Sequence, residues 1–224
     1  MRRLRTLLSW SSGKDSAWSL YMLRSDARYE VAGLVTTINE SADRVAMHAV
    51  RTELLRAQAR ATNLPLWELA IPSPCSNEHY ESVLRAAIAR AEAEAIDCFA
   101  FGDLFLEDIR AYREKQLAPT KLTPVFPLWG RDTQKLAKEM LAGGLRARIT
   151  CVDPRALPAS FAGREFDDAL LHELPAAVDP CGERGEFHTF AYSGPMFSEP
   201  ISIASGIVVE RDGFVFADLT LIPK

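Results

Sequence analysis

The chain has 224 residues, of which 48% are hydrophobic and 25% charged, and its formal net charge is −4. This balance is typical of a globular protein with one large domain or two small ones, and the acidic charge argues against a general nucleic-acid binder. No apolar run reaches the ~18 residues of a membrane-spanning helix, and the four cysteines form no Cys-x-x-Cys pair. We therefore expect a cytoplasmic protein that binds no membrane and has neither a zinc ribbon nor a disulfide framework.

Strand and helix patterns alternate through the first half of the chain. Apolar runs of strand length are separated by segments that carry apolar residues at helical spacing. This alternation predicts βαβ units and a parallel sheet with helices on both faces, with Asn77 as the N-cap of the third helix. The predicted strands are 4–10, 31–37, 64–71 and 97–102, and the predicted helices are 15–24, 45–61, 77–95 and 107–117.

The second half of the chain has a different pattern, which predicts a smaller α+β domain. Residues 122–128 hold two prolines and predict a strand at the sheet edge or a linker. We therefore place a domain boundary there and expect domains at 1–125 and 126–224. Arg211-Asp212-Gly213 predicts a hairpin between the last two strands. The predicted helices are 132–141 and 165–174, and the predicted strands are 145–152, 187–192, 201–210 and 214–222.

The turn between the first strand and the first helix is the most informative segment. It reads Ser11-Ser12-Gly13-Lys14-Asp15-Ser16. The first N–H groups of a helix lack intrahelical partners and the helix dipole favours negative charge there, so this turn predicts a phosphate site. The Walker A pattern fails, because Asp15 follows Gly13-Lys14 and no glycine stands five residues before Gly13. An ordinary serine-rich turn is the alternative.

Two further strand ends suggest parts of a nucleotide site, because open parallel sheets bind ligands at the carboxyl ends of their strands. The second strand ends at Thr36-Thr37, whose backbone could contact an adenine ring. The fourth ends at Gly102-Asp103, where a carboxylate could hold Mg²⁺ against phosphate oxygens. A turn or N-cap aspartate is the alternative for Asp103.

A second polar segment spans residues 179–189 and combines glycines with acidic, thiol and imidazole side chains. Its glycines permit a backbone that folds tightly around a ligand. Its glutamates could act as a base or hold a cation, and its histidine could carry protons near neutral pH. A charged loop is the alternative, and a zinc site is disfavoured because only one cysteine and one histidine are available. The candidates are Cys181, Gly182, Glu183, Gly185, Glu186 and His188.

The turn at 11–16 resembles the pyrophosphate loop (PP-loop) of ATP pyrophosphatases, usually written Ser-Gly-Gly-x-Asp-Ser, with Ser12 standing where the pattern has glycine. With Gly102-Asp103 and the motif Cys-Gly-Glu-x-Gly-Glu-x-His-Thr at 181–189, nearly the whole chain resembles the diphthine–ammonia ligase (diphthamide synthetase) family. The segment 45–51 looks like the bacterial type of that family. The resemblance implies a HUP-type ATP-binding domain followed by a smaller domain that completes a substrate pocket.

The resemblance also implies a reaction with ATP, Mg²⁺, ammonia and a carboxylate. The carboxylate attacks the α-phosphate, pyrophosphate leaves from the loop, and ammonia converts the acyl adenylate to an amide and AMP. Family members amidate diphthine on translation elongation factor 2. Bacteria lack diphthamide, so a bacterial-type relative implies another carboxylate, on a small molecule or a modified protein side chain. A homodimer is compatible with the sequence.

Under this interpretation each candidate residue has an expected role. The expected catalytic residues are Lys14, Asp15, Glu183, Glu186 and His188. The expected nucleotide-binding residues are Ser11, Ser12, Gly13, Lys14, Asp15, Ser16, Thr36 and Gly102, with Asp103 at the metal. The expected substrate-binding residues are His48, Cys181, Gly182, Glu183, Gly185 and Glu186.

Two alternative functions stay open at the level of sequence. A non-catalytic nucleotide sensor of the HUP class would bind ATP or AMP without releasing pyrophosphate. A tRNA-modifying PP-loop enzyme is less favoured, because such enzymes usually need a basic surface and many need paired cysteines. Neither feature is visible in this chain.

Overall fold

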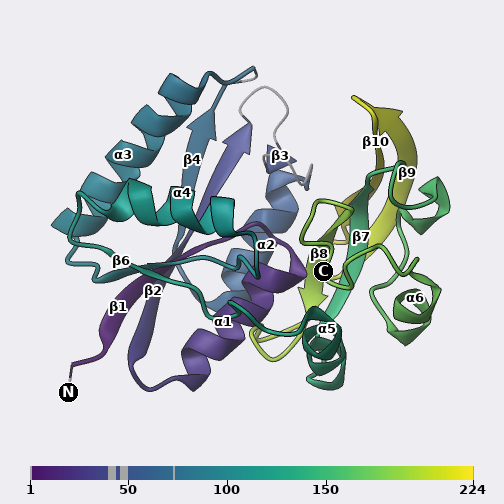
Figure 1. Cartoon of the computed structure of the whole chain (residues 1–224), viewed down its shortest axis with the longest axis horizontal. Coiled ribbons are helices and arrows are strands. Elements are labelled where there is room, and N and C mark those ends of the chain that lie inside the picture. Colours follow the sequence, from purple (N-terminus) through teal and green to yellow (C-terminus); the bar gives the residue numbers. More distant parts are fainter. Residues whose placement is uncertain (1, 40–43, 46–49, 73, 224) are drawn as a thin grey trace.

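Two β-sheets of different kinds follow one another along the chain (Figure 1). The computed structural model describes residues 2–39, 44–45, 50–72 and 74–223. The first sheet contains β1 (Leu4–Ser9), β2 (Tyr29–Asn39), β3 (Arg44–Val45), β4 (Leu66–Ile71), β5 (Cys98–Ala100) and β6 (Thr123–Val125). The helices between these strands are α1 (Lys14–Ser25), α2 (Thr52–Thr62), α3 (Asn77–Ala93) and α4 (Glu107–Leu117).

The first sheet has five parallel strands in the order β4-β2-β1-β5-β6, and the short β3 pairs antiparallel with β2. The chain therefore builds outward from β1 in one direction, returns, and continues with β5 on the other side. Such a reversal creates a crevice at the carboxyl ends of the two central strands. The predicted α/β fold is confirmed. Pro124 lies in the edge strand β6, where a missing N–H group is tolerated.

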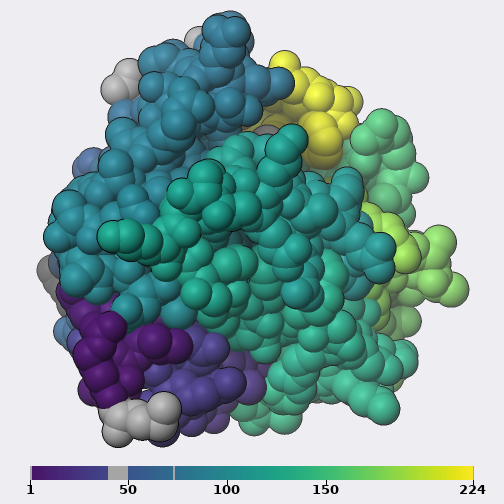
Figure 2. Space-filling view, turned by 60° about the vertical axis from the view of Figure 1, so that its left-hand side comes forward, coloured from purple at the N-terminus to yellow at the C-terminus, as the bar shows by residue number. Residues whose placement is uncertain are grey.

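Helices cover both faces of the first sheet, as predicted. Neighbouring residues of a strand point to opposite faces. Leu8 belongs to one hydrophobic cluster with Trp18 of α1 and Leu54 of α2, whereas Leu7 belongs to a second cluster with Ile88 of α3. Figure 2 shows the blue and teal segments, which include α3 and α4, covering their side of the molecule.

The second sheet is antiparallel, with the order β8-β7-β10-β9, and confirms a second domain built on a sheet. The hydrophobic cluster beneath α1 and α2 continues into it through residues such as Ala147 and Phe190, so the two sheets share one core. No helix in the described ranges is long and apolar enough to cross a membrane. The elements of the second domain are α5 (Thr133–Ala142), β7 (Arg146–Val152), the 3₁₀ turn Ala159–Phe161, α6 (Asp168–Glu173), β8 (Phe187–Ser193), β9 (Ile203–Arg211) and β10 (Phe214–Leu221).

The start of the second helix and the N-cap of the third differ from the predictions. The helix expected over 45–61 begins at Thr52, because the apolar spacing includes Val50, which is buried but precedes the helix. The third helix is capped by Ser76 instead of Asn77, since the Ser76 hydroxyl accepts a hydrogen bond from the backbone N–H of His79 at 3.2 Å. Serine and asparagine are about equally good N-caps, so the sequence does not separate them.

The helix expected over 165–174 is shorter, and its start is set by a cap. The Asp167 carboxylate accepts the backbone N–H of Leu170 at 2.8 Å, which starts α6 at Asp168. Glu165 instead pairs with Arg148 of β7 in an isolated bridge. Because Glu165 pairs with a strand, the predicted first turn of this helix does not form.

Candidate active site

The phosphate loop joins β1 to α1 at the reversal point of the first sheet. Its irregular position, Ser12, has a φ angle of +69°, the left-handed region in which glycine is favoured. Ser12 is fully buried, and its hydroxyl has no hydrogen-bond partner among the described residues. The backbone here thus has the conformation for which the PP-loop pattern supplies glycine, and serine adopts it at a cost of ~1–2 kcal/mol.

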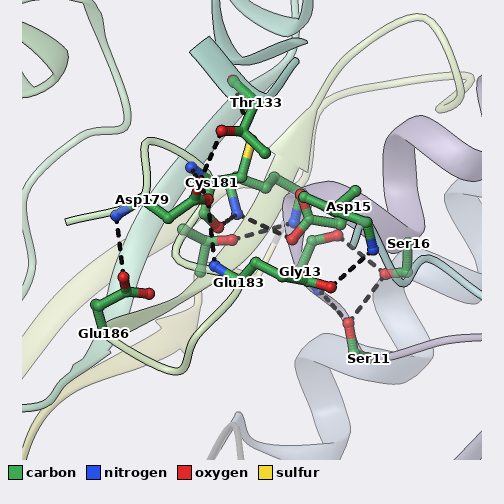
Figure 3. A network of polar contacts seen from close by, with 12 residues as sticks. Ser11, Gly13, Asp15, Ser16, Thr133, Asp179, Cys181, Glu183 and Glu186 are labelled. Atoms are coloured by element: carbon green, nitrogen blue, oxygen red, sulfur yellow. Dashed lines mark hydrogen bonds and ion pairs between the residues drawn. The ribbon is translucent and has the colours of Figure 1, made fainter. Parts of the chain in front are cut away.

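The other serines of the loop form a small network around the helix start (Figure 3). The Ser11 hydroxyl donates to the Ser16 hydroxyl at 3.2 Å and accepts the backbone N–H of Gly13 at 3.3 Å. The Ser16 hydroxyl donates to the Gly13 carbonyl at 2.9 Å. Both hydroxyls therefore lie beside the N-terminal N–H groups of α1, where an anion is favoured.

Lys14 points into the junction between the sheets instead of away from the protein. Its side chain is only 2% exposed, and its ammonium contacts Asp15 Oδ2 at 2.9 Å and donates to the Cys181 carbonyl. Phe166 and Phe187 lie 5.6 and 5.3 Å from the ammonium, measured to the ring centroids. Burial lowers the pKa of Lys14, but the neighbouring carboxylates outweigh it and leave that pKa above its ordinary value. Lys14 is therefore a buried cation.

Three carboxyl groups lie near the helix start, and two of them, Asp15 and Glu183, act on this cation. Burial raises the pKa of Asp103, and Arg113, whose Nε lies 3.7 Å from Asp103 Oδ2, opposes that rise. Burial raises the pKa of Glu183 to about 7, with further contributions from Asp15 and Asp103. Glu183 also accepts the backbone N–H of Leu104 at 2.7 Å, which brings the second domain onto the loop after β5.

Two buried carboxylate oxygens of this group, Asp15 Oδ1 and Asp103 Oδ2, have no hydrogen-bond partner among the described residues. Buried carboxylate oxygens that accept no hydrogen bond suit a hard cation such as Mg²⁺, which needs only one or two carboxylates when phosphate and water supply the rest. No group of three or more His, Cys, Asp or Glu side chains in the described ranges has metal-site geometry. The donor set therefore fits a magnesium ion held together with a phosphate, and not a protein-only metal cage.

Gly102 brings the end of β5 against the phosphate loop. A Cβ atom at this position would lie 3.2 Å from both the Asp15 carbonyl carbon and the Ser16 nitrogen. Contacts this short with backbone require the loop to move by a few tenths of an ångström. Gly102 was expected to bind nucleotide, and the structure shows that its lack of a side chain permits the close approach of two loops.

We expect Gly102→Ala to lower ATP turnover by about tenfold or more, because small displacements of reacting groups are costly. The added methyl group should also destabilise the fold by about 1–3 kcal/mol. Gly213→Ala is the matched control, since Gly213 has a φ of +80° in the β9–β10 hairpin with open space around it. The control should show a similar loss of stability with unchanged turnover in a pyrophosphate-release assay. Equal turnover in both variants would contradict the prediction.

The segment before β8 is a loop held by its own carboxylates. The Glu186 carboxylate accepts the backbone N–H groups of Asp179 and Arg184, each at 2.9 Å. Asp179 in turn accepts the Cys181 N–H at 2.9 Å and the Thr133 hydroxyl at 2.7 Å (Figure 3). Glu186 therefore shapes the loop, and its expected catalytic and substrate-binding roles stay predictions.

The two glycines of this loop have positive φ angles, +67° at Gly182 and +84° at Gly185, as their predicted tight turns require. A Cβ at Gly182 would lie 2.7 Å from the Phe187 carbonyl oxygen. Cys181 is 1% exposed, and burial raises the pKa of its thiol far above the ordinary value, so the thiol is not reactive. Its backbone carbonyl, which binds Lys14, is the part of Cys181 that faces the site.

His188 does not have the environment of a neutral-pH proton carrier. Burial, assisted by the charge of Lys14, lowers the pKa of His188 to about 4. The imidazole is therefore neutral at pH 7, and its expected catalytic role stays a prediction. His48, the other predicted histidine, lies outside the described residues.

A cavity of about 440 Å³ opens beside the phosphate loop, between the sheet and helices α3 and α4. Thr36 lies at its wall and donates its hydroxyl to the Trp10 carbonyl at 2.6 Å. The cavity is mostly apolar, and aromatic rings contribute much of its wall, as is common in small-molecule sites. Its lining includes Ser11, Thr36, Thr37, Tyr80, Phe99, Phe101, Tyr112 and Arg113.

Sequence reasoning gave no role to several residues that build the site. Thr189 accepts the backbone N–H of Lys14 at 3.1 Å, and Gln58 contacts the Ser12 carbonyl. Arg113 lies beside Asp103. Gln58 carried a usable signal, because it is a polar residue four positions after Leu54 on an otherwise apolar helix face. The role of Thr189 depends on β8 lying against the loop, which no local pattern shows.

A phosphate loop at the reversal point of a parallel sheet, with a cavity beside it and a second sheet closing over it, defines a nucleotide-binding α/β protein. The two halves of the chain match separate models of one family, the diphthamide synthase N-terminal domain over residues 4–117 and the diphthamide synthase C-terminal domain over residues 132–217. The chain belongs to the diphthamide synthase family.

Curated relatives carry a consistent name. A diphthine–ammonia ligase of Danio rerio is 27% identical over 90% of this chain and 88% of its own length. The Homo sapiens diphthine–ammonia ligase is 24% identical over 95% of this chain and 87% of its length. A Schizosaccharomyces pombe diphthine–ammonia ligase is 25% identical over 90% of this chain, which corresponds to 36% of that longer protein.

Proposed function

We propose that this protein is an ATP-dependent ligase that adenylates a carboxylate and then forms an amide with ammonia, releasing AMP and pyrophosphate. The observation that carries the proposal is the junction itself. The phosphate loop of one domain lies directly against the 179–189 segment of the other, in a chain whose two halves both match the diphthamide synthase family. Relatives that share nearly the whole chain are named diphthine–ammonia ligases.

The site offers a place for each part of ATP. The adenosine would occupy the aromatic cavity of about 440 Å³, with its base toward Thr36. The phosphates would lie at the N-terminus of α1, beside the hydroxyls of Ser11 and Ser16. Asp103 and Asp15 would hold Mg²⁺, which neutralises phosphate charge when bound.

The chain's own residues would supply the electrostatic part of catalysis. Backbone N–H groups and Lys14 offset negative charge that develops on the departing pyrophosphate. Glu183, whose pKa burial raises to about 7, would accept a proton from the attacking ammonia. Its hydrogen bond to Leu104 keeps this carboxyl between the two domains while it does so.

A pyrophosphate-release screen tests the proposal. Purified protein is incubated with ATP, Mg²⁺ and ammonium, together with a panel of carboxylates that includes diphthine. We expect release that requires both ammonium and one class of carboxylate, with AMP formed in equal amount. ATP binding by calorimetry without release for any carboxylate would instead support a nucleotide sensor, and tight salt-sensitive tRNA binding would support a tRNA-modifying enzyme.

Three finer expectations accompany this proposal without a test in the structure. Membership of the bacterial type is supported by the segment 45–51, most of which lies outside the described residues. It would direct the screen toward carboxylates other than diphthine. A homodimer and a cytoplasmic location stay predictions of the sequence.

A further inference from the structure

A buried glutamine on α2 connects the phosphate loop to both sheets. Gln58 is fully buried. Its Oε1 accepts the indole N–H of Trp10 at 2.8 Å, and its Nε2 donates to the carbonyls of Ser12 at 3.0 Å and Ala191 at 2.6 Å. Because an unpaired buried amide is costly, this side chain holds its three partners in fixed relative positions.

The second sheet holds the same part of the loop. The Ser12 carbonyl also accepts the backbone N–H of Ala191 at 2.9 Å. Two residues earlier on β8, the Thr189 hydroxyl accepts the N–H of Lys14 at 3.1 Å. The Ser12 carbonyl is thus held from two directions, by a side chain of the first domain and a strand of the second.

This arrangement decides where the next N–H group points. A peptide group is planar and trans, so its C=O and N–H point in opposite directions. With the Ser12 carbonyl turned toward Gln58 and β8, the Gly13 N–H is turned the other way, to the side where the Ser11 hydroxyl lies 3.3 Å away. The hydrogen bonds to the Ser12 carbonyl also keep Ser12 at a φ of +69°, a conformation that serine disfavours when it is unrestrained.

We propose that Gln58 is a positioning residue of the phosphate loop. It helps to hold the Ser12 carbonyl, maintains the left-handed conformation of Ser12 and so directs the Gly13 N–H toward the Ser11 hydroxyl, where a phosphate would bind. The inference rests on the proposed function only in naming ATP as the ligand. The restraint on Ser12 exists whether or not the protein turns ATP over.

The test combines two substitutions. Gln58→Met has a similar length and removes the amide, so only the Ala191 N–H still holds the Ser12 carbonyl and the left-handed conformation is less restrained. Ser12→Gly removes the need for a restraint, because glycine adopts positive φ readily. Leu55→Val is the control, since Leu55 is buried on the same helix and takes no part in these hydrogen bonds. Gln58→Leu is the second variant if Q58M is not obtained folded.

ATP affinity is measured by calorimetry without Mg²⁺. We expect Q58M to weaken ATP binding about tenfold, which corresponds to the net free energy of about one hydrogen bond. Adding S12G to Q58M should restore the affinity to within about threefold of the wild type. L55V should change the affinity little, and S12G should shift it by the same factor in L55V as in the wild type.

Thermal unfolding gives an independent comparison, because the effect of S12G on Tm should be larger in the wild type than in Q58M. S12G should raise Tm in the wild type and in L55V, because it relieves the strain of a left-handed serine. In Q58M the gain should be clearly smaller, because serine has already relaxed. An equal gain in Q58M, together with no recovery of ATP affinity, would overturn the proposal and leave Gln58 a packing residue. If the wild type binds no ATP, the proposed function fails, while the Tm comparison still decides the role of Gln58.

Discussion

Lys14→Met is expected to lower kcat/KM for ATP by at least about 100-fold, the loss seen when a preorganised charge donor is removed. The ammonium is the cation that the structure places beside Asp15 and near Glu183. Without it, a triphosphate would approach Asp15, Asp103 and Glu183 with only Arg113, beside Asp103, to offset their charge. The expected loss is therefore shared between ATP affinity and kcat, and the pyrophosphate-release assay at varied ATP concentration separates the two.

The same substitution should destabilise the protein, so a control must separate the two effects. Removing one member of a buried ion pair costs about 3–5 kcal/mol, and somewhat less here because Asp15 is 25% exposed. The double variant K14M/D15N removes both charges, so its stability should return to within about 1 kcal/mol of the wild type. Its turnover should stay low. A double variant that regains turnover along with stability would show that Lys14 only supports the fold.

Local sequence patterns predicted the helices and strands that carry the site. The apolar run at 4–10, the Ser/Gly turn and the following helix were expected within one residue of their observed positions, and the helix over 107–117 has the predicted bounds. These segments have strong periodicity and clear breakers, so local propensity and tertiary structure agree. The strand ends then placed Gly102-Asp103 beside the loop, because a parallel sheet brings its carboxyl ends to one edge.

Contacts between the domains could not be predicted in this way. The sequence indicated that Lys14 would face a phosphate, but its ammonium contacts the Cys181 carbonyl, 167 residues further along the chain. The hydrogen bond from the Lys14 N–H to Thr189 likewise requires β8 to lie on the loop. Such pairings follow from how two sheets pack, and no spacing rule within one segment contains that information.

The protonation states of buried residues could not be predicted from the sequence either. A histidine in a polar, glycine-rich motif suggested a group that titrates near neutral pH, but burial beside Lys14 lowers the pKa of His188 to about 4. The same low-polarity surroundings move the pKa of Glu183 up to about 7. Burial therefore moves the titration expected near neutral pH from His188 to Glu183, because desolvation favours the neutral form of both.

Glu183 should consequently make the stability of the fold depend on pH. Its pKa is about 7 in the folded protein, against an ordinary value of 4.5, so the native state holds a proton that the unfolded chain releases between these values. The stabilisation is complete below about pH 4.5 and is lost as the pH rises through 7. Relative to Glu183→Gln, the wild type should lose about 1–3 kcal/mol between pH 5 and pH 8, measured by denaturant unfolding at each pH. Glu107→Gln, at an exposed glutamate on α4, should show no such trend.

The catalytic role of the same carboxyl predicts the opposite dependence for activity. If Glu183 accepts the ammonia proton, only its ionised form works, so turnover at a fixed concentration of free ammonia should rise with pH through about 7. E183Q should lower turnover by about 10²-fold or more and abolish that rise, while its amide oxygen still accepts the Leu104 N–H. Because the ionised form is at once the less stable and the active one, the two pH profiles should cross near the same pKa. A rise in turnover that persists in E183Q would assign the titration to another group.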